Sequence, residues 1–590
     1  MDDINRLKNK IPIVIGVTGH RNIAKDDFKD IKEVVEKGLS EIVDLCKKSK
    51  KDKDKETPVI LLTGLAEGAD MLVTDVAIDL EIPYIAVLPC KLEEYKKSFS
   101  DKEVLDKLDE YIKKALDTII VDDIENDFDN QPGQTMENYR YRQVGIYIVQ
   151  HSSLLLALWD GEKYKEKYGC GTADIVDIAL NHTFVKKEIG PYFGMVGNCS
   201  VMWIKCRREG DDKENDIVRK YLLPSIYNPA AEDKYHEVPI LPEITKSIIK
   251  KTIEYNSTVT NLDKINKDRW LLEENEYTKT SDYQKSLHSH YLKSDNLSGK
   301  QKTKFTMAVW FFAILGMAVA LLFTFYDEGI WMFCSLLCGL FVVVLIIYYF
   351  YANSYRRQYH RKYLEWRALA ETLRTQFYVS VCGLDYNICD SFTWMQKNDM
   401  VWIDRAIAAL SVGNIENRVN DLSKIRSKWI GDKTKSEGQY GYHARKKLRN
   451  GKIAKKHRRW SNGLLISTLI LYAIIFIAEI LGLLGIIDCF DAVIINNYKL
   501  TITTRQLFQM TCWVLASVSL LLTASLGKLS YSRHQRDNER MECLYFTSLN
   551  KWDTTSVHFK QLVITLAREE IVENGIWLSY MADNDLEITL

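Results

Sequence analysis

Four short glycine-containing turns hold the residues of this 590-residue chain that are best suited to chemistry. These turns are Gly16–Arg21 (GVTGHR), Thr63–Asp70 (TGLAEGAD), Trp159–Gly161 (WDG) and Gly169–Asp174 (GCGTAD). Glycines let backbone N–H groups approach a phosphate closely, and a helix that begins in such a turn adds the positive end of its dipole. Unless they are ordinary surface residues, the adjacent His20 and Arg21 also suit an anion. The turns therefore predict the binding of a nucleotide-like ligand.

Several of these residues also permit a purely structural interpretation. Gly19, Gly64 and Gly68 would serve equally well as tight-turn glycines, because glycine adopts positive φ angles without steric cost. Asp70 and Asp174 fall in the first turn of expected helices, where a carboxylate complements the helix dipole. The sequence leaves open whether each residue contacts a ligand or only shapes its turn.

The turns follow apolar segments that predict a parallel sheet. Near-continuous apolar runs rich in strand-forming residues alternate with helical patterns, which is typical of a sheet covered on both faces. The expected strands are Pro12–Thr18, Val59–Thr63, Tyr84–Leu88, Leu154–Trp159 and Val201–Cys206, and the expected helices are Asp26–Cys46, Gly68–Leu80, Lys102–Leu116 and Thr172–Lys187. Ligands of such sheets bind beyond the carboxyl ends of the strands. We therefore expect an α/β Rossmann-like domain over residues 1–210.

Charge and hydropathy exclude a wholly soluble protein. The 79 Lys and Arg residues balance 79 Asp and Glu residues, so we expect no global attraction to nucleic acid. Four apolar windows are long enough to cross a bilayer core of ~30 Å, and only the third holds a charged residue, Glu479. The windows are Phe305–Phe325, Gly329–Tyr355, Gly463–Ile487 and Gln506–Gly527.

Basic residues flank the windows in a pattern that orients them. They are Lys300, Lys302 and Lys304 before the first window, Arg356, Arg357, Arg361 and Lys362 after the second, Lys455, Lys456, Arg458 and Arg459 before the third, and Lys528, Arg533 and Arg536 after the fourth. Cytoplasmic loops of membrane proteins carry an excess of such residues. We therefore expect two transmembrane hairpins in the inner (cytoplasmic) membrane, with the N- and C-termini cytoplasmic.

The expected membrane half is an all-α four-helix transmembrane domain with cytoplasmic helical extensions. Its segments are a helical connector (211–300), a first hairpin (301–355), a cytoplasmic helical insert (356–460), a second hairpin (461–528) and a helical tail (529–590). The basic segment His443–Arg459 leads directly into the third window, which favours contact with anionic lipid over nucleic acid. No Cys-x-x-Cys pair occurs, so we expect no metal site.

Glu479 is the candidate for a pore-lining residue. An ionisable group inside a span usually faces a bundle interior or water. The alternative is that Glu479, near the outer end of its span, hydrogen-bonds to a neighbouring group. The hydroxyl residues of the fourth window permit the same two interpretations, because they suit either an aqueous path or close helix packing. They are Thr511, Ser517, Ser519, Thr523 and Ser525.

The order GVTGHR, TGLAEGAD, LLLALWDG and GCGTAD resembles the SLOG superfamily over about residues 11–210. The resemblance implies a Rossmannoid pocket for a nucleotide-derived signalling ligand, with no other cofactor. The residues that we expect to bind the ligand are Thr18, Gly19, His20, Arg21, Gly64, Glu67, Gly68, Asp70, Asp160, Gly161, Gly171 and Thr172.

One departure from the superfamily bears on catalysis. LOG-type hydrolases carry a catalytic Glu at the position that Ile175 occupies here, and an isoleucine cannot perform acid–base chemistry. Glu67 or Asp174 would have to substitute. We therefore expect no catalytic residue, and a pocket that senses its ligand rather than hydrolysing it.

The run Arg367–Arg374 (RALAETLR) and the tail Ala567–Trp577 (AREEIVENGIW) resemble the SLATT family in its four-span (S-4TM) version. The two resemblances together imply a pore-forming effector of a bacterial anti-phage or conflict system. An ADP-ribose-type or cyclic-nucleotide messenger from a partner enzyme would gate it. Four spans enclose little space, so we expect a homo-oligomer. The alternatives are a membrane-anchored nucleotide N-glycosidase and a passive membrane-tethered sensor or scaffold.

Overall fold

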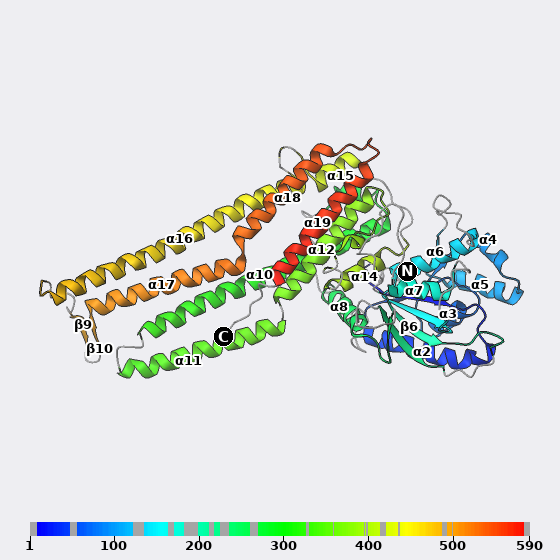
Figure 1. The fold of residues 1–590 in the computed structure, drawn as a ribbon, viewed down its shortest axis with the longest axis horizontal. Coiled ribbons are helices and arrows are strands. Elements are labelled where there is room, and N and C mark those ends of the chain that lie inside the picture. The colour runs from blue at the N-terminus through cyan, green and yellow to red at the C-terminus, as the bar shows by residue number, and fades with distance from the viewer. Residues whose placement is uncertain are drawn as a thin grey trace. The chain divides into compact units, whose positions relative to one another are not determined.

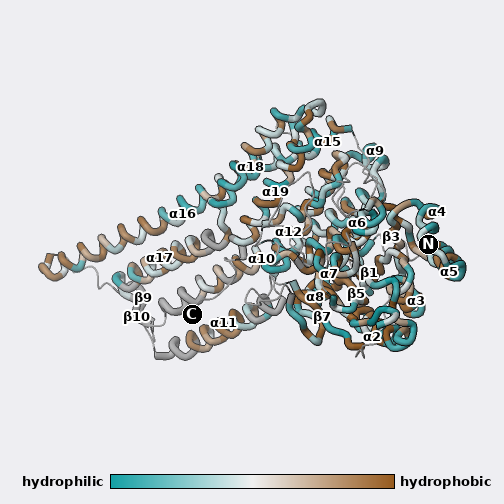
Figure 2. Tube along the Cα trace, turned by 45° about the vertical axis from the view of Figure 1, so that its right-hand side comes forward, coloured by the Kyte–Doolittle hydropathy of each residue, from teal (hydrophilic) through white to brown (hydrophobic). Residues whose placement is uncertain are grey.

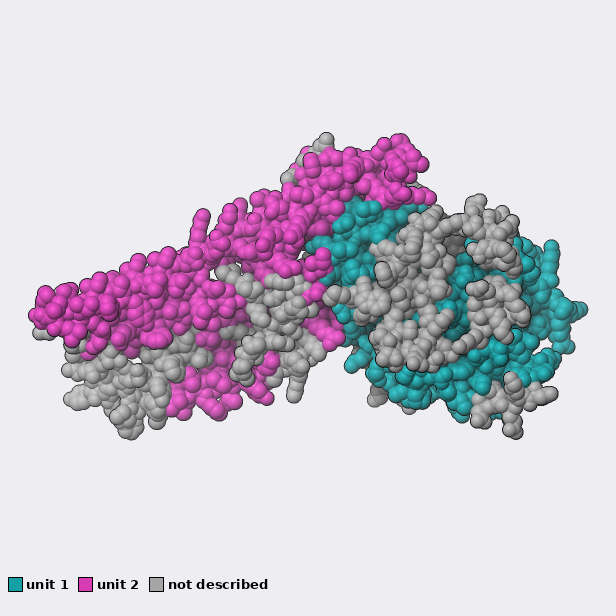
Figure 3. Space-filling model, viewed as in Figure 1, with its two compact units in different colours: residues 1–293, 368–420, 563–575 teal, residues 294–367, 421–562, 576–590 magenta. Residues whose placement is uncertain are grey.

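The computed structural model describes most of the chain, in two compact units (Figure 3). Unit 1 comprises residues 1–293, 368–420 and 563–575, and unit 2 comprises 294–367, 421–562 and 576–590. The described residues are 9–47, 56–121, 135–162, 170–181, 199–211, 217–224, 235–259, 270–325, 330–357, 359–393, 396, 399–413, 421–432, 434, 437–486, 493–497 and 500–582. The boundary between the units falls inside three continuous helices, α10 (Asp282–Phe325), α12 (Tyr359–Val381) and α19 (Phe559–Ala582).

Unit 1 contains an eight-stranded mixed sheet in the order β4-β3-β2-β1-β5-β6-β7-β8. The strands are β1 (Ile13–Gly19), β2 (Val59–Thr63), β3 (Tyr84–Leu88), β4 (Asp117–Ile120), β5 (Leu154–Trp159), β6 (Ser200–Lys205), β7 (Arg219–Pro224) and β8 (Tyr235–Val238). Strands β1 to β6 are parallel, and β7 and β8 add antiparallel pairings at one edge. The α/β class is confirmed, and the sheet continues past residue 210, where we expected the domain to end.

Helices cover both faces of this sheet (Figure 1). They are α2 (Phe28–Cys46), α3 (Ala69–Asp79), α4 (Leu92–Tyr95), α5 (Lys102–Lys114), α6 (Met136–His151), α7 (Thr172–Asn181) and α8 (Glu243–Val259). On one face Ile13 and Ile15 of β1 share a core with α2 and α3. On the other face a Cβ at Gly16 would collide with Ile148 of α6. All residues of β2, β3 and β5 are buried, as a doubly covered sheet requires.

The strand order changes direction at β1. From β1 the chain proceeds outward through β2, β3 and β4, and then returns to place β5 and β6 on the other side of β1. In open α/β sheets the crevice for a ligand lies outside the carboxyl ends of the strands, at such a switch point. The gap between the ends of β1 and β5 is therefore the position in unit 1 where a ligand site is expected.

Two helices of unit 1, α8 and α14 (Val401–Leu410), bond to the opposite, amino edge of the sheet. The side-chain amide of Asn256 donates to the carbonyl of Ile11 at 2.8 Å and accepts from its N–H at 3.0 Å. Arg405 Nη1 donates to the carbonyl of Ser152 at 2.8 Å. Because Ile11 and Ser152 precede β1 and β5, these polar contacts fix helices to the strand starts.

Unit 2 is built mainly from long helices, and over the residues that the structure describes two of them are long and apolar enough to cross a membrane. Its elements are parts of α10, α12 and α19, together with α11 (Ile330–Arg357), α15 (Leu422–Trp429), α16 (Gly438–Leu483), β9 (Val493–Asn497), β10 (Leu500–Thr503), α17 (Thr504–Leu529) and α18 (Tyr531–Lys551). The two candidate spans lie in α16 and at Leu507–Ala524 of α17, where only 11% and 17% of the apolar window is buried. This exposure distinguishes them from the core helices of a soluble domain.

The helix α16 changes character along its length (Figure 2). Its first half is hydrophilic, and its second half, beyond Trp460, is apolar. Helix α17 lies beside the apolar half, and the hairpin of β9 and β10 joins the two helices. The sequence did not predict this hairpin. The helices α10 and α11 carry the other two apolar windows, of which the described part includes the shorter apolar stretch Leu336–Tyr351.

Candidate functional site

A cleft of about 1220 Å³ opens at the carboxyl edge of the sheet in unit 1. It lies where the switch point places it, because the residues that follow β1 and β5 both line it. Ten of the twelve residues expected from the sequence are among its walls, whereas Glu67 and Gly68 are not. The ten are Thr18, Gly19, His20, Arg21, Gly64, Asp70, Asp160, Gly161, Gly171 and Thr172.

The imidazole of His20 joins three of the four predicted turns. Its side chain is only 7% exposed, and its Nε2 lies 3.2 Å from the N–H of Asp160, which donates to it. Its Nδ1 lies 3.4 Å from Thr172 Oγ1. Burial lowers the pKa of His20, against the Asp160 carboxylate, which raises it. Nε2 also lies 3.2 Å from Asp160 Oδ1, so the ring meets both the N–H and the carboxylate of Asp160 while its Nδ1 faces the start of α7.

The carboxyl group of Asp160 is kept in its ionised form at the cleft. Burial alone would raise its pKa, but the Glu162 N–H, His20 and Arg208 together lower it below the ordinary range. Its Oδ1 accepts from Glu162 N–H at 3.0 Å, and Arg208 Nε donates to its Oδ2 at 2.7 Å. The Arg208 side chain is 49% exposed, so this guanidinium neutralises Asp160 while still facing the cleft solvent.

Most of the cationic groups of the cleft were not predicted from the sequence. Arg207 and Arg208 follow the end of β6, and Arg142 lies on α6. Arg207 donates to both carboxylate oxygens of Asp27, at 2.9 and 2.7 Å. The run Cys206–Glu209 (CRRE), directly after an apolar strand, was the signal that would have identified two of these arginines.

The predicted Arg21 lies in the cleft wall and stacks on an aromatic ring. Its guanidinium carbon is 4.7 Å from the ring centroid of Tyr141, which also lines the cleft. Such a cation–π contact holds the guanidinium over the face of the Tyr141 ring without neutralising its charge. The sequence did not indicate Tyr141, because the helix α6 that carries it was not predicted.

Two of the predicted glycines are explained by close backbone packing. Gly68 has φ +84°, and a Cβ there would collide with the backbone carbonyl of Arg21. A Cβ at Gly19 would collide with Ala69. The Ala69 N–H donates to the carbonyl of His20 at 3.1 Å. These glycines therefore let the turn after β1 touch the start of α3, which matches their structural interpretation.

The two first-turn acids bond to groups of the protein. Burial raises the pKa of Asp70 to about 7, although the N–H of Ala66 and the Arg21 guanidinium oppose this. The Ala66 N–H donates to Asp70 Oδ2 at 3.3 Å. Arg142 Nε donates to Asp174 Oδ2 at 2.7 Å, and burial raises the pKa of this carboxyl as well. Both acids thus hold the local structure that forms the cleft.

Ile175, which occupies the position of the catalytic Glu in the LOG resemblance, packs against apolar groups. Ile175 is 5% exposed and packs so closely on α6 that a Cβ at Gly145 would collide with it. With Val17, Val144 and Ile148 it forms the apolar part of the cleft lining. Over the described residues, no group of three His, Cys, Asp or Glu side chains is placed to hold a metal ion.

In unit 2, Glu479 forms an ion pair with Arg505 across the α16–α17 contact, at 2.5 Å. The side chains are 37% and 47% exposed. This geometry matches the alternative in which Glu479 bonds to a neighbouring group, and its role as a pore residue stays a prediction. Two predicted hydroxyl residues also bond across these helices, since Ser519 and Thr523 contact Ser461.

No family model matches the chain, and no curated protein matches its sequence. The resemblances to the SLOG and SLATT families accordingly stay predictions.

Proposed function

We propose that this protein is a membrane effector that senses a nucleotide-derived messenger in the cleft of unit 1 and opens or forms a pore with unit 2. The single observation that carries the proposal is that one chain combines a cleft at the switch point of a sheet with apolar helices that expose membrane-length surfaces. The defence role is supported by the SLOG and SLATT resemblances.

The chemistry of the cleft favours a nucleotide over a simple anion. Its volume of about 1220 Å³ accommodates a ligand with a base, a sugar and phosphates. Ile175, Ile148 and the Tyr141 ring offer apolar and aromatic surface for a base. Arg21 and Arg208 offer guanidinium forks, which suit phosphate oxygens.

Sensing is favoured over hydrolysis because an apolar residue replaces the catalytic Glu of the LOG resemblance, and the aspartates of the predicted turns are held by protein groups. Ile175 occupies the LOG catalytic position, and Asp70, Asp160 and Asp174 each bond to protein groups. A membrane-anchored N-glycosidase remains the alternative for the same cleft, and release of free base would distinguish it.

We further propose four membrane spans, in α10, α11, α16 and α17, with both termini cytoplasmic. The two described candidate spans and the hydrophilic first half of α16 support this topology. Symmetric assembly of several chains would supply the pore lining. The helices α10, α12 and α19 each continue from one unit into the other. A conformational change in unit 1 would therefore be transmitted to unit 2 along continuous helices.

The test uses the full-length protein in liposomes loaded with a self-quenching dye. ADP-ribose, cyclic di-AMP and cyclic tri-AMP are the probes, and chromatography of the same mixtures with NAD detects any released base. We expect one probe class to bind and to release dye. Leakage that is independent of every probe, or absent with all of them, would refute the proposal, and free base would establish the N-glycosidase.

A matched pair of variants ties the response to the cleft. Arg208→Ala removes an arginine that pairs with Asp160 at the cleft. Arg219→Ala removes an arginine of β7 that pairs with Glu41 of α2, outside the cleft. A charge-assisted hydrogen bond to phosphate is worth about ten-fold in affinity. We therefore expect about a ten-fold weaker binding for Arg208→Ala and no change for Arg219→Ala.

A further inference from the structure

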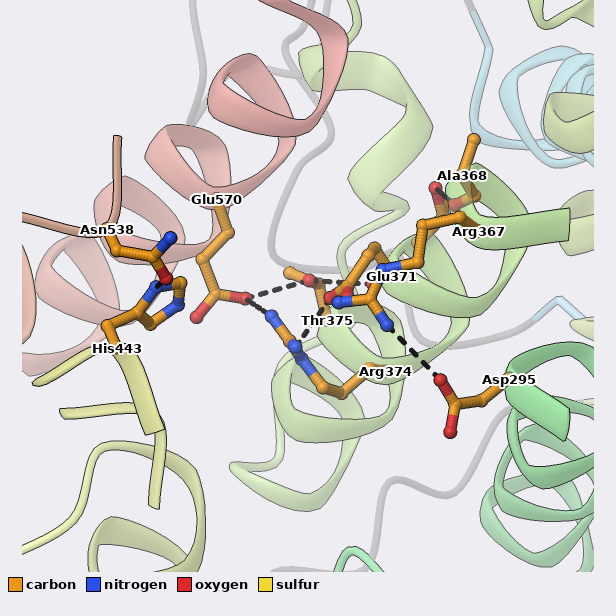
Figure 4. A network of polar contacts seen from close by, with 10 residues as sticks. Asp295, Arg367, Ala368, Glu371, Arg374, Thr375, His443, Asn538 and Glu570 are labelled. Carbon is orange, nitrogen blue, oxygen red and sulfur yellow. Dashed lines mark hydrogen bonds and ion pairs between the residues drawn. The ribbon is translucent and has the colours of Figure 1, made fainter. Parts of the chain in front are cut away.

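Two sequence motifs that are almost 200 residues apart bond to each other inside unit 1 (Figure 4). They are Arg367–Arg374 on α12 and Ala567–Trp577 on α19, the segments that resemble the SLATT family. Arg374 Nη2 lies 3.4 Å from Glu570 Oε2, and the Thr375 hydroxyl donates to the same oxygen at 2.8 Å. Arg374 Nη1 lies 2.5 Å from Glu371 Oε2 on its own helix.

The charged groups of this network are all buried. Arg374 is 8% exposed, Glu371 9% and Glu570 4%. A buried ion pair adds little net stability, because each charge loses its water, but loss of one partner leaves a costly unpaired charge. One role of such groups, attested in some proteins, is to specify one arrangement over another.

Glu570 occupies a core position of its helix. The buried residues of α19 around it recur at helical spacing and are otherwise mostly apolar: Val563, Leu566, Ala567 and Ile571 are at most 2% exposed. An apolar side chain at position 570 would complete this stripe without any loss of hydration. The carboxylate therefore serves a purpose other than packing.

A second polar contact fixes the same stretch of α19. Gln396 Nε2 donates to the carbonyl of Ile571 at 2.8 Å, and a Cβ at Gly575 would collide with the Gln396 side chain. Segment 567–575 is therefore held within unit 1 by a contact to its backbone as well as by the buried ion pair. The ion pair is able to exchange partners without a change of backbone, because Glu371 and Glu570 both lie beside the Arg374 guanidinium.

We propose that the Arg374–Glu570 pair is a coupling clasp: Arg374 binds Glu570 in one state of the effector and only Glu371 in the other. Thr375 positions Glu570 for the first state. Both helices of the clasp continue into unit 2, so its state is carried along α12 and α19. This inference rests on the proposed function for what triggers the exchange.

The variant that tests the clasp replaces the network by uncharged groups of similar volume, Glu371→Gln, Arg374→Met and Glu570→Met combined. It avoids leaving a buried charge unpaired, so the protein is expected to fold with a thermal midpoint at least equal to that of the wild type. Glu569→Gln, an exposed neighbour on the same helix, is the matched control.

The first readout needs no ligand. If the pair is a clasp, amide hydrogen exchange over residues 563–575 in the ligand-free triple variant is at least ten-fold faster than in the wild type, and Glu569→Gln exchanges at the wild-type rate. Equal exchange in the triple variant overturns the clasp, whatever any nucleotide does.

The second readout separates the clasp from the proposed function. With the probe that binds the wild type, among ADP-ribose, cyclic di-AMP and cyclic tri-AMP, the triple variant is expected to keep its affinity and lose at least ten-fold of the stimulated dye release. Unchanged stimulation overturns the clasp alone. A wild type that binds none of these probes overturns the proposed function, and the exchange experiment then decides the clasp.

Discussion

The carboxylate of Glu479 lies 2.5 Å from the guanidinium of Arg505, which joins the ends of α16 and α17 next to the β9–β10 hairpin. The same helices are bonded further along by Ser461 and Ser519. Buried residues recur every seven positions on α16, at Ser461, Thr468 and Ile475, as in a left-handed coiled coil of two α-helices. The two helices therefore form one hairpin with a fixed register.

Charge neutralisation of either partner is expected to loosen this hairpin. Glu479→Gln and Arg505→Gln should each lower stability by about 0.2–1 kcal/mol, because both side chains are partly exposed. The double variant should cost no more than the larger single change. Thermal unfolding in detergent measures this cycle. Restoration by the exchanged pair, Glu479→Arg with Arg505→Glu, would support the contact, and strictly additive losses would contradict it.

The hydroxyl cluster of the hairpin should matter more than an isolated hydroxyl on the same helix. Ser461 Oγ lies 2.7 Å from Thr523 Oγ1, and the Ser519 hydroxyl donates to the Ser461 carbonyl at 2.9 Å. Hydrogen bonds between membrane helices contribute about 0.6 kcal/mol each. Ser461→Ala should lower the unfolding free energy by about that amount. Thr511→Ala, whose hydroxyl bonds only within its own helix, is the control that should change nothing.

Alanine at Gly68 should be much more destabilising than alanine at Gly210. Both glycines have positive φ angles, +84° and +86°, so either substitution costs about 1–2 kcal/mol of backbone strain. At Gly68 the new Cβ also meets the Arg21 carbonyl, whereas no described heavy atom lies within 4 Å of a Cβ at Gly210. The collision should add about 1–3 kcal/mol. Equal melting temperatures for the two variants would show that the turns do not touch.

The buried carboxyl of Asp70 should give stability a distinctive pH dependence. Burial raises its pKa from 3.8 to about 7, so between about pH 4 and pH 7 the folded protein retains a proton that the unfolded chain releases. This contribution is therefore fully present below pH 4 and is lost as the pH rises through 7. The slope approaches about 1.4 kcal/mol per pH unit.

Asp70→Asn removes the titrating group and should flatten this part of the pH profile. The exposed Asp101, which caps α5 by accepting from the Glu103 N–H, provides the control, since Asp101→Asn should leave the slope in place. Denaturant midpoints from pH 4 to pH 8 measure both variants. A slope that persists in Asp70→Asn would assign the dependence to another group.

The sequence predicted the central strands well because they are buried on both faces and therefore read as unbroken apolar runs. It missed β4, whose first residue, Asp117, is exposed, and β7, which mixes Arg219 and Lys220 with apolar residues at the sheet edge. It also missed α6, which carries Tyr141 and Arg142 into the cleft. Short or partly solvated elements do not contain enough periodicity to be recognised.

The candidate site was predictable where a glycine turn followed a strand, and not where a cleft wall came from an unpredicted element. His20 and Asp160 were identified, but their contact was not, since only the strand order brings β1 and β5 together. The partner of Glu479 was missed for a simpler reason. Arg505 stands one residue outside the apolar window that was used to define the span.

Helices α8 and α14 attach at the amino edge of the sheet, through Asn256 and Arg405, while the cleft occupies the carboxyl edge. Selection can therefore act on the two edges separately. Under the proposed function, the turns around the cleft are free to diversify until they fit a different messenger, and the anchoring side chains need not change with them. A lineage of such proteins would retain the same anchors and the same output while replacing the signal to which it responds.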